Sequence, residues 1–254
     1  MIFVGYGCDG RGIFSFNHLT GMLKNTIIVS KILFSECDNM QKIDIFKTES
    51  EPIGYSLLLP DDFDSTKSYP MILFLHGAGE RGNGVSELDR VCAVALPKHL
   101  LSEAAYANAI VLCPQCPCDK VWNQFIYDVK ALCDRVAAKY CVDLNRISVT
   151  GLSMGGYGTW EIGMTFPGFF SALAPICGGG MSWRTPALKG KPVWAFHGNA
   201  DSVVSITNSI DMVNGARKNG ALVKFTIFDG VDHNSWDSAY LDTKVIDFLI
   251  NSTL

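Results

Sequence analysis

Val149-Thr150-Gly151-Leu152-Ser153-Met154-Gly155-Gly156 is the stretch that decides how this chain is expected to fold. It continues an apolar strand pattern that begins near Arg146, and a helix-compatible segment follows it. A Gly-x-Ser-x-Gly motif at a strand–helix junction makes so tight a turn that small residues must stand two positions to either side of the serine. Such a turn strains and exposes the serine, and it aims the free N–H groups of the next helix at the reacting centre. The motif therefore predicts that Ser153 is a nucleophile.

Composition limits the classes of protein to which the chain can belong. At 254 residues, with 48% hydrophobic and 18% charged residues, it fits one large α/β domain with a sizeable core. The net charge of −4 and the lack of a basic stripe argue against a nucleic-acid partner. No apolar run approaches the roughly 18 residues that span a bilayer, because Lys31 interrupts the nearest one, at 26–34.

Nine cysteines are unusually many for such a chain. The spacing Cys113-x-x-Cys116-x-Cys118 can ligate zinc, but no second Cys-x-x-Cys or spaced His pair follows, so no metal site is expected. A disulfide among these three remains an alternative. Without a recognisable secretory signal, we expect reduced thiols and a cytoplasmic location. The cysteines in apolar contexts, where a thiol acts as a small hydrophobic group, are Cys133, Cys141 and Cys177.

The first 39 residues differ from the rest of the chain. They carry glycines among aromatic residues but no persistent helical or strand period, and they do not resemble a signal peptide. An alternating strand pattern begins at Met40 and runs to Phe46. We therefore expect a catalytic domain over 40–254 and a dispensable extension over 1–39, whose structure and natural origin stay open.

From Met40 onward, strand patterns alternate with helix patterns. Strands are expected over 40–46, 54–59, 71–75, 110–112, 147–150, 172–176, 193–196 and 223–228. Helices are expected over 124–140 (capped by Asn123), from Ser153 to near Phe166, over 206–219, and from Trp236 onward, the last burying Leu241, Val245, Phe248 and Leu249. This alternation predicts an α/β fold with a mostly parallel sheet, helices on both faces, and ligands at the carboxyl ends of the strands.

A nucleophilic serine needs a base, and His233 is the best candidate among the five histidines. It lies in a polar loop just after a late strand, from which its imidazole can reach Ser153. His18 lies in the leader, and His99 is expected in a loop or short helix at the surface. His76 and His197 each end a buried strand and precede a glycine, so we expect them to brace loops by hydrogen bonds.

The acid that orients the base is expected to be Asp201. It stands in the loop after the strand 193–196, where a carboxylate can accept the imidazole N–H and hold the right tautomer. Asp229 and Asp232 are rivals, since they are close to His233 in sequence. Adjacent loop residues generally point apart, so we expect Asp232 to be solvated.

Two backbone N–H groups are expected to bind the oxyanion. One belongs to Met154, the residue after the nucleophile. The other lies in the glycine-rich loop His76-Gly77-Ala78-Gly79-Glu80, which follows the strand 71–75. Ala78 is the first choice there and Gly79 the second.

These segments resemble the motifs of a known superfamily, the α/β-hydrolases. The resemblance rests on His76-Gly77-Ala78-Gly79, the stretch 151–158 and His197-Gly198-x-x-Asp201, in the chain order Ser153, Asp201, His233. Pro114-Gln115-Cys116-Pro117 with Trp122, and 233–236 with Ala239-Tyr240, are similar to its compact carboxylesterase and polyhydroxybutyrate-depolymerase-like branch, which includes feruloyl and acetyl-xylan esterases. The chain departs from that branch where Val203-Val204-Ser205 follows Asp201, since a proline is common there.

The resemblance implies an α/β-hydrolase fold, and no insertion between the expected strands is long enough for a large lid. It also implies a serine carboxylesterase that cleaves small or short-chain esters through an acyl-enzyme, with no metal or organic cofactor. The expected partner is a small ester or an esterified saccharide, with feruloyl or acetyl groups of plant polysaccharide as candidates; the oligomeric state stays open. Trp122 either stacks on the substrate or packs beneath the loop. Two alternatives are a prolyl-oligopeptidase-type serine peptidase and a non-catalytic binding module on the same fold.

Overall fold

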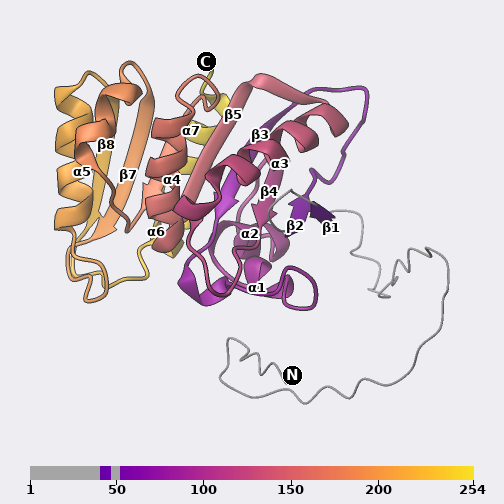
Figure 1. Ribbon diagram of the computed structural model, residues 1–254, viewed down its shortest axis with the longest axis horizontal. Helices are drawn as coiled ribbons and strands as arrows, with labels where there is room; N and C mark the ends of the chain where they lie inside the picture. The colour runs from indigo at the N-terminus through magenta and orange to yellow at the C-terminus, as the bar shows by residue number, and fades with distance from the viewer. Residues whose placement is uncertain (1–40, 47–51) are drawn as a thin grey trace, which may run out of the picture.

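The computed structural model describes residues 41–46 and 52–254, and an eight-stranded sheet forms its centre (Figure 1). The strands are β1 (Gln41–Phe46), β2 (Ile53–Leu58), β3 (Tyr69–Leu75), β4 (Ile110–Pro114), β5 (Val142–Leu152), β6 (Leu173–Ile176), β7 (Pro192–Gly198) and β8 (Leu222–Phe228). They lie in the order β1-β2-β4-β3-β5-β6-β7-β8. The pairs β1–β2 and β2–β4 are antiparallel, and every other pair is parallel. The sheet is therefore mostly parallel, as expected.

Helices cover both faces of this sheet. The α-helices are α1 (Asp89–Cys92), α2 (Ala95–Leu101), α3 (Ile126–Lys139), α4 (Met154–Thr165), α5 (Thr207–Lys218), α6 (Trp236–Leu241) and α7 (Val245–Asn251), and the 3₁₀ helices are η1 (Ala78–Glu80), η2 (Trp122–Gln124) and η3 (Ser182–Leu188). Buried residues of α3, α4 and α5 pack on one face, and those of α1, α2, α6 and α7 pack on the other (Figure 1). Side chains alternate along a strand, so neighbours such as Leu73 and Phe74 belong to the two different cores.

The helix expected over 124–140 begins later than predicted. Asn123 lies inside η2 and does not cap α3, because Phe125 has an extended φ of −144° that separates the two helices. Gln124 instead turns its side chain back to accept the backbone N–H of Val121 at 2.9 Å.

The single C-terminal helix expected from Trp236 is two helices. α6 ends at Leu241, and Thr243 forms the break by donating to the Ala239 carbonyl at 2.6 Å and accepting the Val245 N–H at 3.1 Å. Leu241 was expected to be buried, but it is 44% exposed because the break turns it outward. Val245 and Leu249 are buried as predicted, while Phe248 is partly buried.

The expected environments of His99 and Cys141 were wrong, because each side chain contacts a residue from a distant part of the chain. His99 was assigned to the surface, yet it is 5% exposed in α2, and its Nε2 lies 2.7 Å from Asp237 Oδ1 of α6. Cys141 was assigned to an apolar environment, yet it is exposed, and its thiol contacts the Ser65 carbonyl. The short helices α1 and η3 were not predicted, and α2 was expected only as a loop or short helix, since each is too brief to show a helical period.

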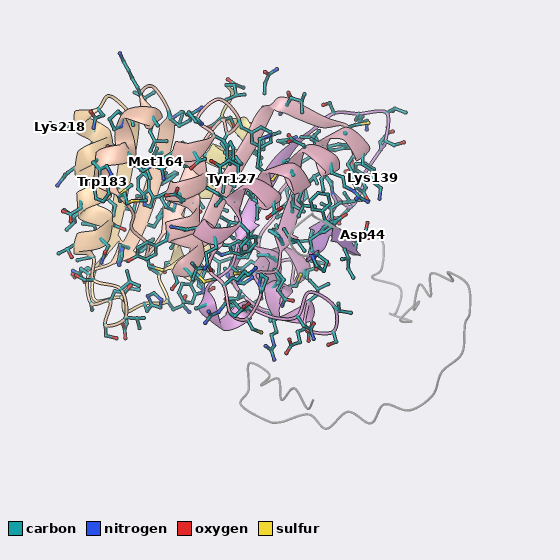
Figure 2. All side chains as sticks on the ribbon, in the orientation of Figure 1. Asp44, Tyr127, Lys139, Met164, Trp183 and Lys218 are labelled. Atoms are coloured by element: carbon teal, nitrogen blue, oxygen red, sulfur yellow. The ribbon has the colours of Figure 1, made fainter. Side chains whose placement is uncertain are left out.

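The strand β1 closes one edge of the sheet beside α3. Asp44 of β1 and Lys139 of α3 face each other there, with Nζ and Oδ2 4.0 Å apart (Figure 2). Such an exposed pair adds little to the stability. The expectation for residues 1–39, like Met40 itself, concerns residues outside the described part of the chain. Within that part, no helix is long and apolar enough to cross a membrane.

The turn from β5 into α4 depends on backbone contacts that leave no room for side chains. A Cβ atom on Gly155 would lie 1.8 Å from the Leu75 carbonyl oxygen, and one on Gly151 would lie 2.5 Å from the same atom. A Cβ atom on Gly156 would lie 2.3 Å from the Ile176 carbonyl oxygen. The start of α4 is thus pressed against the ends of β3 and β6, which explains why the motif requires small residues here.

Gly155→Ala is expected to destabilise the protein by roughly 3 kcal/mol or more, because the added methyl must displace the backbone of a central strand. Gly168→Ala is the matched control, since no atom lies within 4 Å of the added Cβ; we expect a change within about 0.5 kcal/mol. Urea unfolding of both variants measures the difference. Equal stabilities would contradict the close approach of α4 to β3.

Candidate active site

Ser153 stands between β5 and α4 in a strained conformation. Its φ of 53° and ψ of −118° are unusual for a residue with a side chain. Its backbone N–H donates to the Ile176 carbonyl at 3.0 Å, which ties the turn to β6. The serine is partly exposed at the carboxyl edge of the sheet, where ligands of such folds bind.

His233 lies against Ser153, as predicted. Its Nε2 is 3.0 Å from Ser153 Oγ, and its Nδ1 is 2.8 Å from Asp201 Oδ2. A carboxylate only accepts hydrogen bonds, so Nδ1 carries the proton and Nε2 is left to accept the serine hydroxyl. The Trp236 ring packs edge-on against the imidazole, with 5.5 Å between centroids. The arrangement can therefore move a proton from Ser153 to His233.

Asp201 is the acid that the structure places beside His233. Its side chain is fully buried, and Oδ1 accepts the backbone N–H groups of Val203 and Val204 at 2.9 and 2.8 Å. Burial raises the pKa of this carboxyl, but the hydrogen bonds from His233, Val204 and Val203 outweigh burial, so the pKa lies below its usual value. Asp201 is consequently ionised at neutral pH and stabilises a protonated His233.

The two rival carboxylates hold loops together instead. Exposed Asp232 accepts the Ser202 backbone N–H at 2.7 Å and thereby joins the loops that follow β7 and β8. Asp229 accepts the Asn199 side-chain amide at 2.7 Å between the same loops. Asp232 also accepts the backbone N–H of His233 at 2.8 Å, and it is exposed, in keeping with the expectation that it is solvated.

His76 and His197 are buried braces, as the sequence suggested. His76 Nε2 accepts the Cys116 backbone N–H at 2.9 Å, and its Nδ1 donates to the Gly77 carbonyl at 2.6 Å. His197 Nδ1 lies 2.7 Å from Ser209 Oγ, and its Nε2 lies 2.9 Å from the Val204 carbonyl and 3.1 Å from Asp201 Oδ2. Burial lowers the pKa of His76 to about 4 and also lowers that of His197, so both rings are neutral at pH 7.

The two candidate oxyanion donors begin helices. Met154 is the first residue of α4 and Ala78 the first of η1, and the N–H groups of such residues have no acceptor within their own helix. A Cβ atom on Gly77 would lie 3.7 Å from Ser153 Cβ, so the Ala78 loop passes over the nucleophile. Gly79 follows one residue further along the same exposed loop. The assignment of Ala78 rather than Gly79 stays a prediction.

Trp122 fits the second of the two roles considered for it, packing beneath the loop. It is 1% exposed, and its indole N–H donates to the His76 carbonyl at 2.9 Å. Its ring lies edge-on to His76, with 4.9 Å between centroids, and stacks at an angle on Phe125. The expectation that it stacks on a substrate is therefore not met, because its neighbours enclose the ring. It supports the loop that contains Ala78 through its hydrogen bond to His76.

A pocket that the sequence did not reveal lies at the first turn of α4, which begins one residue after Ser153. It has a volume of about 370 Å³ and is lined by Val121, Asn123, Met154 and Tyr157. Met154 and Tyr157 come from the first turn of α4, directly after the nucleophile. Tyr157 belongs to the stretch 151–158 around the nucleophile. Val121 and Asn123 belong to η2 and its N-cap, and so short a turn has no periodic pattern by which the sequence could reveal it.

The cysteine motif at the end of β4 combines two free thiols with Cys118, which is disulfide-bonded, contrary to the expectation of reduced thiols. Cys113 and Cys116 are buried free thiols, so they form no disulfide with each other or with Cys118. Burial raises the pKa of the Cys116 thiol to about 12 and that of Cys113 well above its usual value. In the described residues, no cluster of metal ligands includes these thiols.

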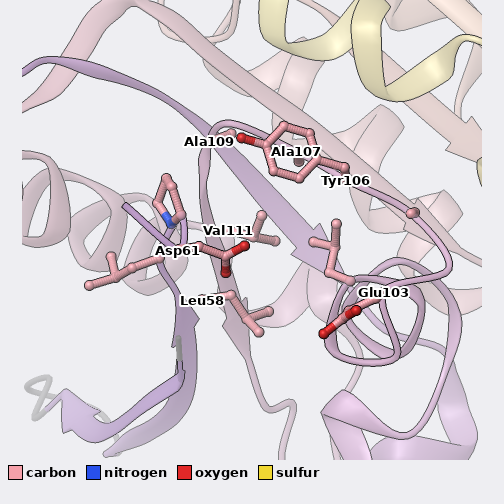
Figure 3. A pocket seen from close by; sticks show the side chains of 11 residues that line it. Leu58, Asp61, Glu103, Tyr106, Ala107, Ala109 and Val111 are labelled. Atoms are coloured by element: carbon pink, nitrogen blue, oxygen red, sulfur yellow. The ribbon is translucent and has the colours of Figure 1, made fainter. Parts of the chain in front are cut away.

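A second hollow, of about 220 Å³, lies at the other edge of the sheet (Figure 3). Its walls include Leu58, Asp61, Glu103, Tyr106 and Val111. Val111 is the second residue of β4, which runs parallel to β3, and β3 in turn runs parallel to β5. This hollow therefore faces the amino ends of the strands, away from Ser153, and is not the pocket for a reacting ester.

The strand order, the helices on both faces and a serine at the turn after β5 together define an α/β-hydrolase fold. Residues 48–218 match the sequence profile of the family described as "Putative esterase", so the chain belongs to that family. The description of this family agrees with the carboxylic ester hydrolase class expected from the sequence.

Individual relatives carry related names. The chain is 24% identical over 162 residues to "Probable feruloyl esterase C" of Aspergillus niger, covering 62% of this chain and 58% of that protein. A solved thermostable esterase is 32% identical, with a TM-score of 0.71, over 84% of this chain and 63% of that one. The feruloyl esterase module of Clostridium thermocellum, solved with sinapinate, is 16% identical with a TM-score of 0.63, over 85% and 89%, and shows the fold alone. The chain thus spans about three fifths of the length of the first two.

The buried neutral His76 makes the stability depend on pH. Its pKa rises from about 4 in the folded state to about 6.5 in the unfolded chain, so the unfolded state binds the proton more tightly. The stabilisation is complete above pH 6.5 and is lost as the pH falls toward 4, and it amounts to about 3 kcal/mol in that window. Urea unfolding between pH 7.5 and 4.5 measures it. A His76→Asn variant should be less stable at pH 7.5 but show a shallower pH slope; an unchanged slope would contradict this role.

Proposed function

We propose that this protein is a serine carboxylesterase that hydrolyses small or short-chain esters through Ser153, His233 and Asp201. The observation that carries the proposal is the chain of two hydrogen bonds, 3.0 Å from Ser153 to His233 and 2.8 Å from His233 to Asp201. These distances lie within the range needed between nucleophile, base and orienting acid. A buried, ionised Asp201 supports this order of proton transfer.

In the proposed reaction, Ser153 Oγ attacks the ester carbonyl while His233 Nε2 accepts its proton. The negative charge on the carbonyl oxygen is stabilised by the N–H groups of Ala78 and Met154. His233 then gives its proton to the departing alcohol, which leaves an acyl group on Ser153. Water activated by the same imidazole releases the acid and restores the serine. Every proton in this cycle moves through His233, so the proposed reaction uses no cofactor.

The pocket beside Ser153 favours a small and largely apolar acyl group. Val121, Met154 and the Tyr157 ring supply apolar surface, while Asn123 supplies one amide for a hydrogen bond. The exposed Ala78 and Val121 leave this side open to solvent, in line with a fold without a large lid. The names of the fungal relatives make feruloyl esters of plant polysaccharide the first candidates, with acetyl esters as the simpler alternative.

The peptidase alternative receives less support. Solved dipeptidyl peptidases share the fold at 15–18% identity, over only 35–36% of their own chains, which says nothing about activity. A non-catalytic binding module would not need the aligned hydrogen bonds of the Ser153 site.

Ser153→Ala and His233→Ala are each expected to lower kcat by roughly 10⁶-fold, and Asp201→Asn by somewhat less, since the three act as one unit. Asp232→Asn is the matched control, because that carboxylate joins loops but does not orient the imidazole; we expect a loss below about tenfold. Hydrolysis of p-nitrophenyl esters from acetate to decanoate, of methyl ferulate and of a proline anilide measures activity and class. Larger losses from Asp232→Asn than from Asp201→Asn would overturn the acid assignment, and preference for the anilide would favour the peptidase.

Asn123→Trp is expected to fill the pocket next to Ser153 without disturbing the core, because Asn123 is exposed. We expect kcat/KM for methyl ferulate and for the longer p-nitrophenyl esters to fall at least about tenfold, equivalent to about 1.4 kcal/mol. Acetate, which is too small to need the pocket, should change less than about threefold. Equal losses on acetate and ferulate would show that the acyl group binds elsewhere.

A further inference from the structure

Cys177 is a buried thiol beneath the Ser153 site that the proposed reaction does not use. It follows the last residue of β6, is 0% exposed and is a free cysteine. Its φ of 40° is in the left-handed region, and its N–H donates to the Phe196 carbonyl at 2.9 Å. The Ser153 backbone N–H donates at 3.0 Å to the carbonyl of Ile176, the residue directly before Cys177. A cysteine is thus held directly behind the nucleophile.

Three different ligand types converge at this point. Cys177 Sγ, a carboxylate oxygen of Asp201 and a ring nitrogen of His233 all lie within 4.8 Å of one another. Across residues 41–46 and 52–254, no other group of three or more such side chains meets this test. The three come from the segments that follow β6, β7 and β8, so the fold and not the local sequence brings them together.

Ser235 adds an independent observation at the same place. It is 0% exposed, and its hydroxyl has no hydrogen-bond partner among the described residues. The backbone N–H of Ser235 donates to the His233 carbonyl at 2.8 Å, so Ser235 lies next to one of the three ligands. A buried hydroxyl without a hydrogen-bond partner is costly. A cation that its oxygen can coordinate would therefore stabilise it.

The spacing suits a tetrahedral ion after a small adjustment. Zinc binds sulfur at about 2.3 Å and imidazole nitrogen or carboxylate oxygen at about 2.0–2.2 Å, which places ligand atoms about 3.4–3.6 Å apart. Asp201 Oδ2 and His233 Nδ1, now 2.8 Å apart, would have to separate by less than about 1 Å. Thiolate and imidazole select thiophilic ions, whereas Mg²⁺ and Ca²⁺ prefer oxygen ligands.

We propose that Cys177, Asp201 and His233 form an inhibitory binding site for a thiophilic divalent cation such as Zn²⁺ or Cd²⁺. The ion enters from the side of His233, whose side chain is 18% exposed. It forms one bond to Cys177 Sγ, whose proton is released to solvent, and one bond to His233 Nδ1, whose proton moves to Nε2. Asp201 Oδ2 exchanges its hydrogen bond with the imidazole for a bond to the ion.

Inhibition follows from this change of tautomer. With the ion on Nδ1 and the proton on Nε2, His233 can no longer accept the proton of Ser153. This consequence rests on the proposed function, but binding of the ion does not. A thiol binds the ion as a thiolate, so the ion must displace the proton of Cys177.

The test uses Cd²⁺ on the full chain after treatment with a chelator. Binding is followed without substrate by the ultraviolet cadmium–thiolate absorption band, and inhibition is followed with p-nitrophenyl acetate. Cys177→Ala and the size-conserving Cys177→Ser are compared with Cys141→Ser, which removes an exposed free thiol away from the site. Each variant is referred to its own rate without metal, and Mg²⁺ serves as the control ion.

We expect Cd²⁺ to give the band and to inhibit both the wild-type protein and Cys141→Ser. Both Cys177 variants should raise the half-inhibiting concentration at least tenfold and lose the band contributed by that thiol. Inhibition that persists unchanged in Cys177→Ser, or that disappears in Cys141→Ser, would overturn the site. If esterase activity is absent while the Cys177-dependent band is present, the metal site stands and the proposed function fails.

Discussion

The structure of the site depends on the absence of side chains at the start of α4. Because Gly155 and Gly151 meet the Leu75 carbonyl at distances that no Cβ atom tolerates, the helix begins directly against the sheet. That contact forces Ser153 into its strained turn and lifts its hydroxyl above the carboxyl edge. Met154 thereby becomes the first residue of α4, so its N–H has no acceptor within its own helix.

Around this turn, buried polar contacts hold the loops that carry the other groups. Asp201 is fixed by two backbone N–H groups and contacts both His197 and His233, so one carboxylate positions two rings. His76 and Trp122 do the same for the loop that contains Ala78, through the hydrogen bonds of the imidazole and the indole. The site is therefore assembled by neutral, buried histidines whose protonation the interior disfavours.

Prediction from the sequence succeeded where the signal is local and failed where a distant partner decides. The Ser153 motif and the apolar runs of the strands carry their own periodicity, so the sheet and the helices on both faces followed from them. His99 was misplaced because Asp237, 138 residues away, supplies its partner. The burial of Leu241 was predicted wrongly because Thr243 ends the helix through side-chain hydrogen bonds, which the spacing of apolar residues does not reveal. The sequence left open whether Trp122 stacks on a substrate or packs beneath the loop. Its indole N–H donates to the His76 carbonyl, which is distant in sequence, and this contact holds it beneath the loop.

The sequence by itself determined the α/β alternation, the tight turn around Ser153 and the order of the three candidate catalytic residues, since these depend on residue type, spacing and the rule that parallel strands end at one edge. Only the tertiary structure decided that Asp201 and not Asp232 faces the imidazole, that Val121 and Asn123 line the pocket, and that Cys177 lies beneath the triad. The physical reason is that each of these is a contact between loops from different strands. Its geometry is set by the packing of the sheet, which no local stretch of sequence contains.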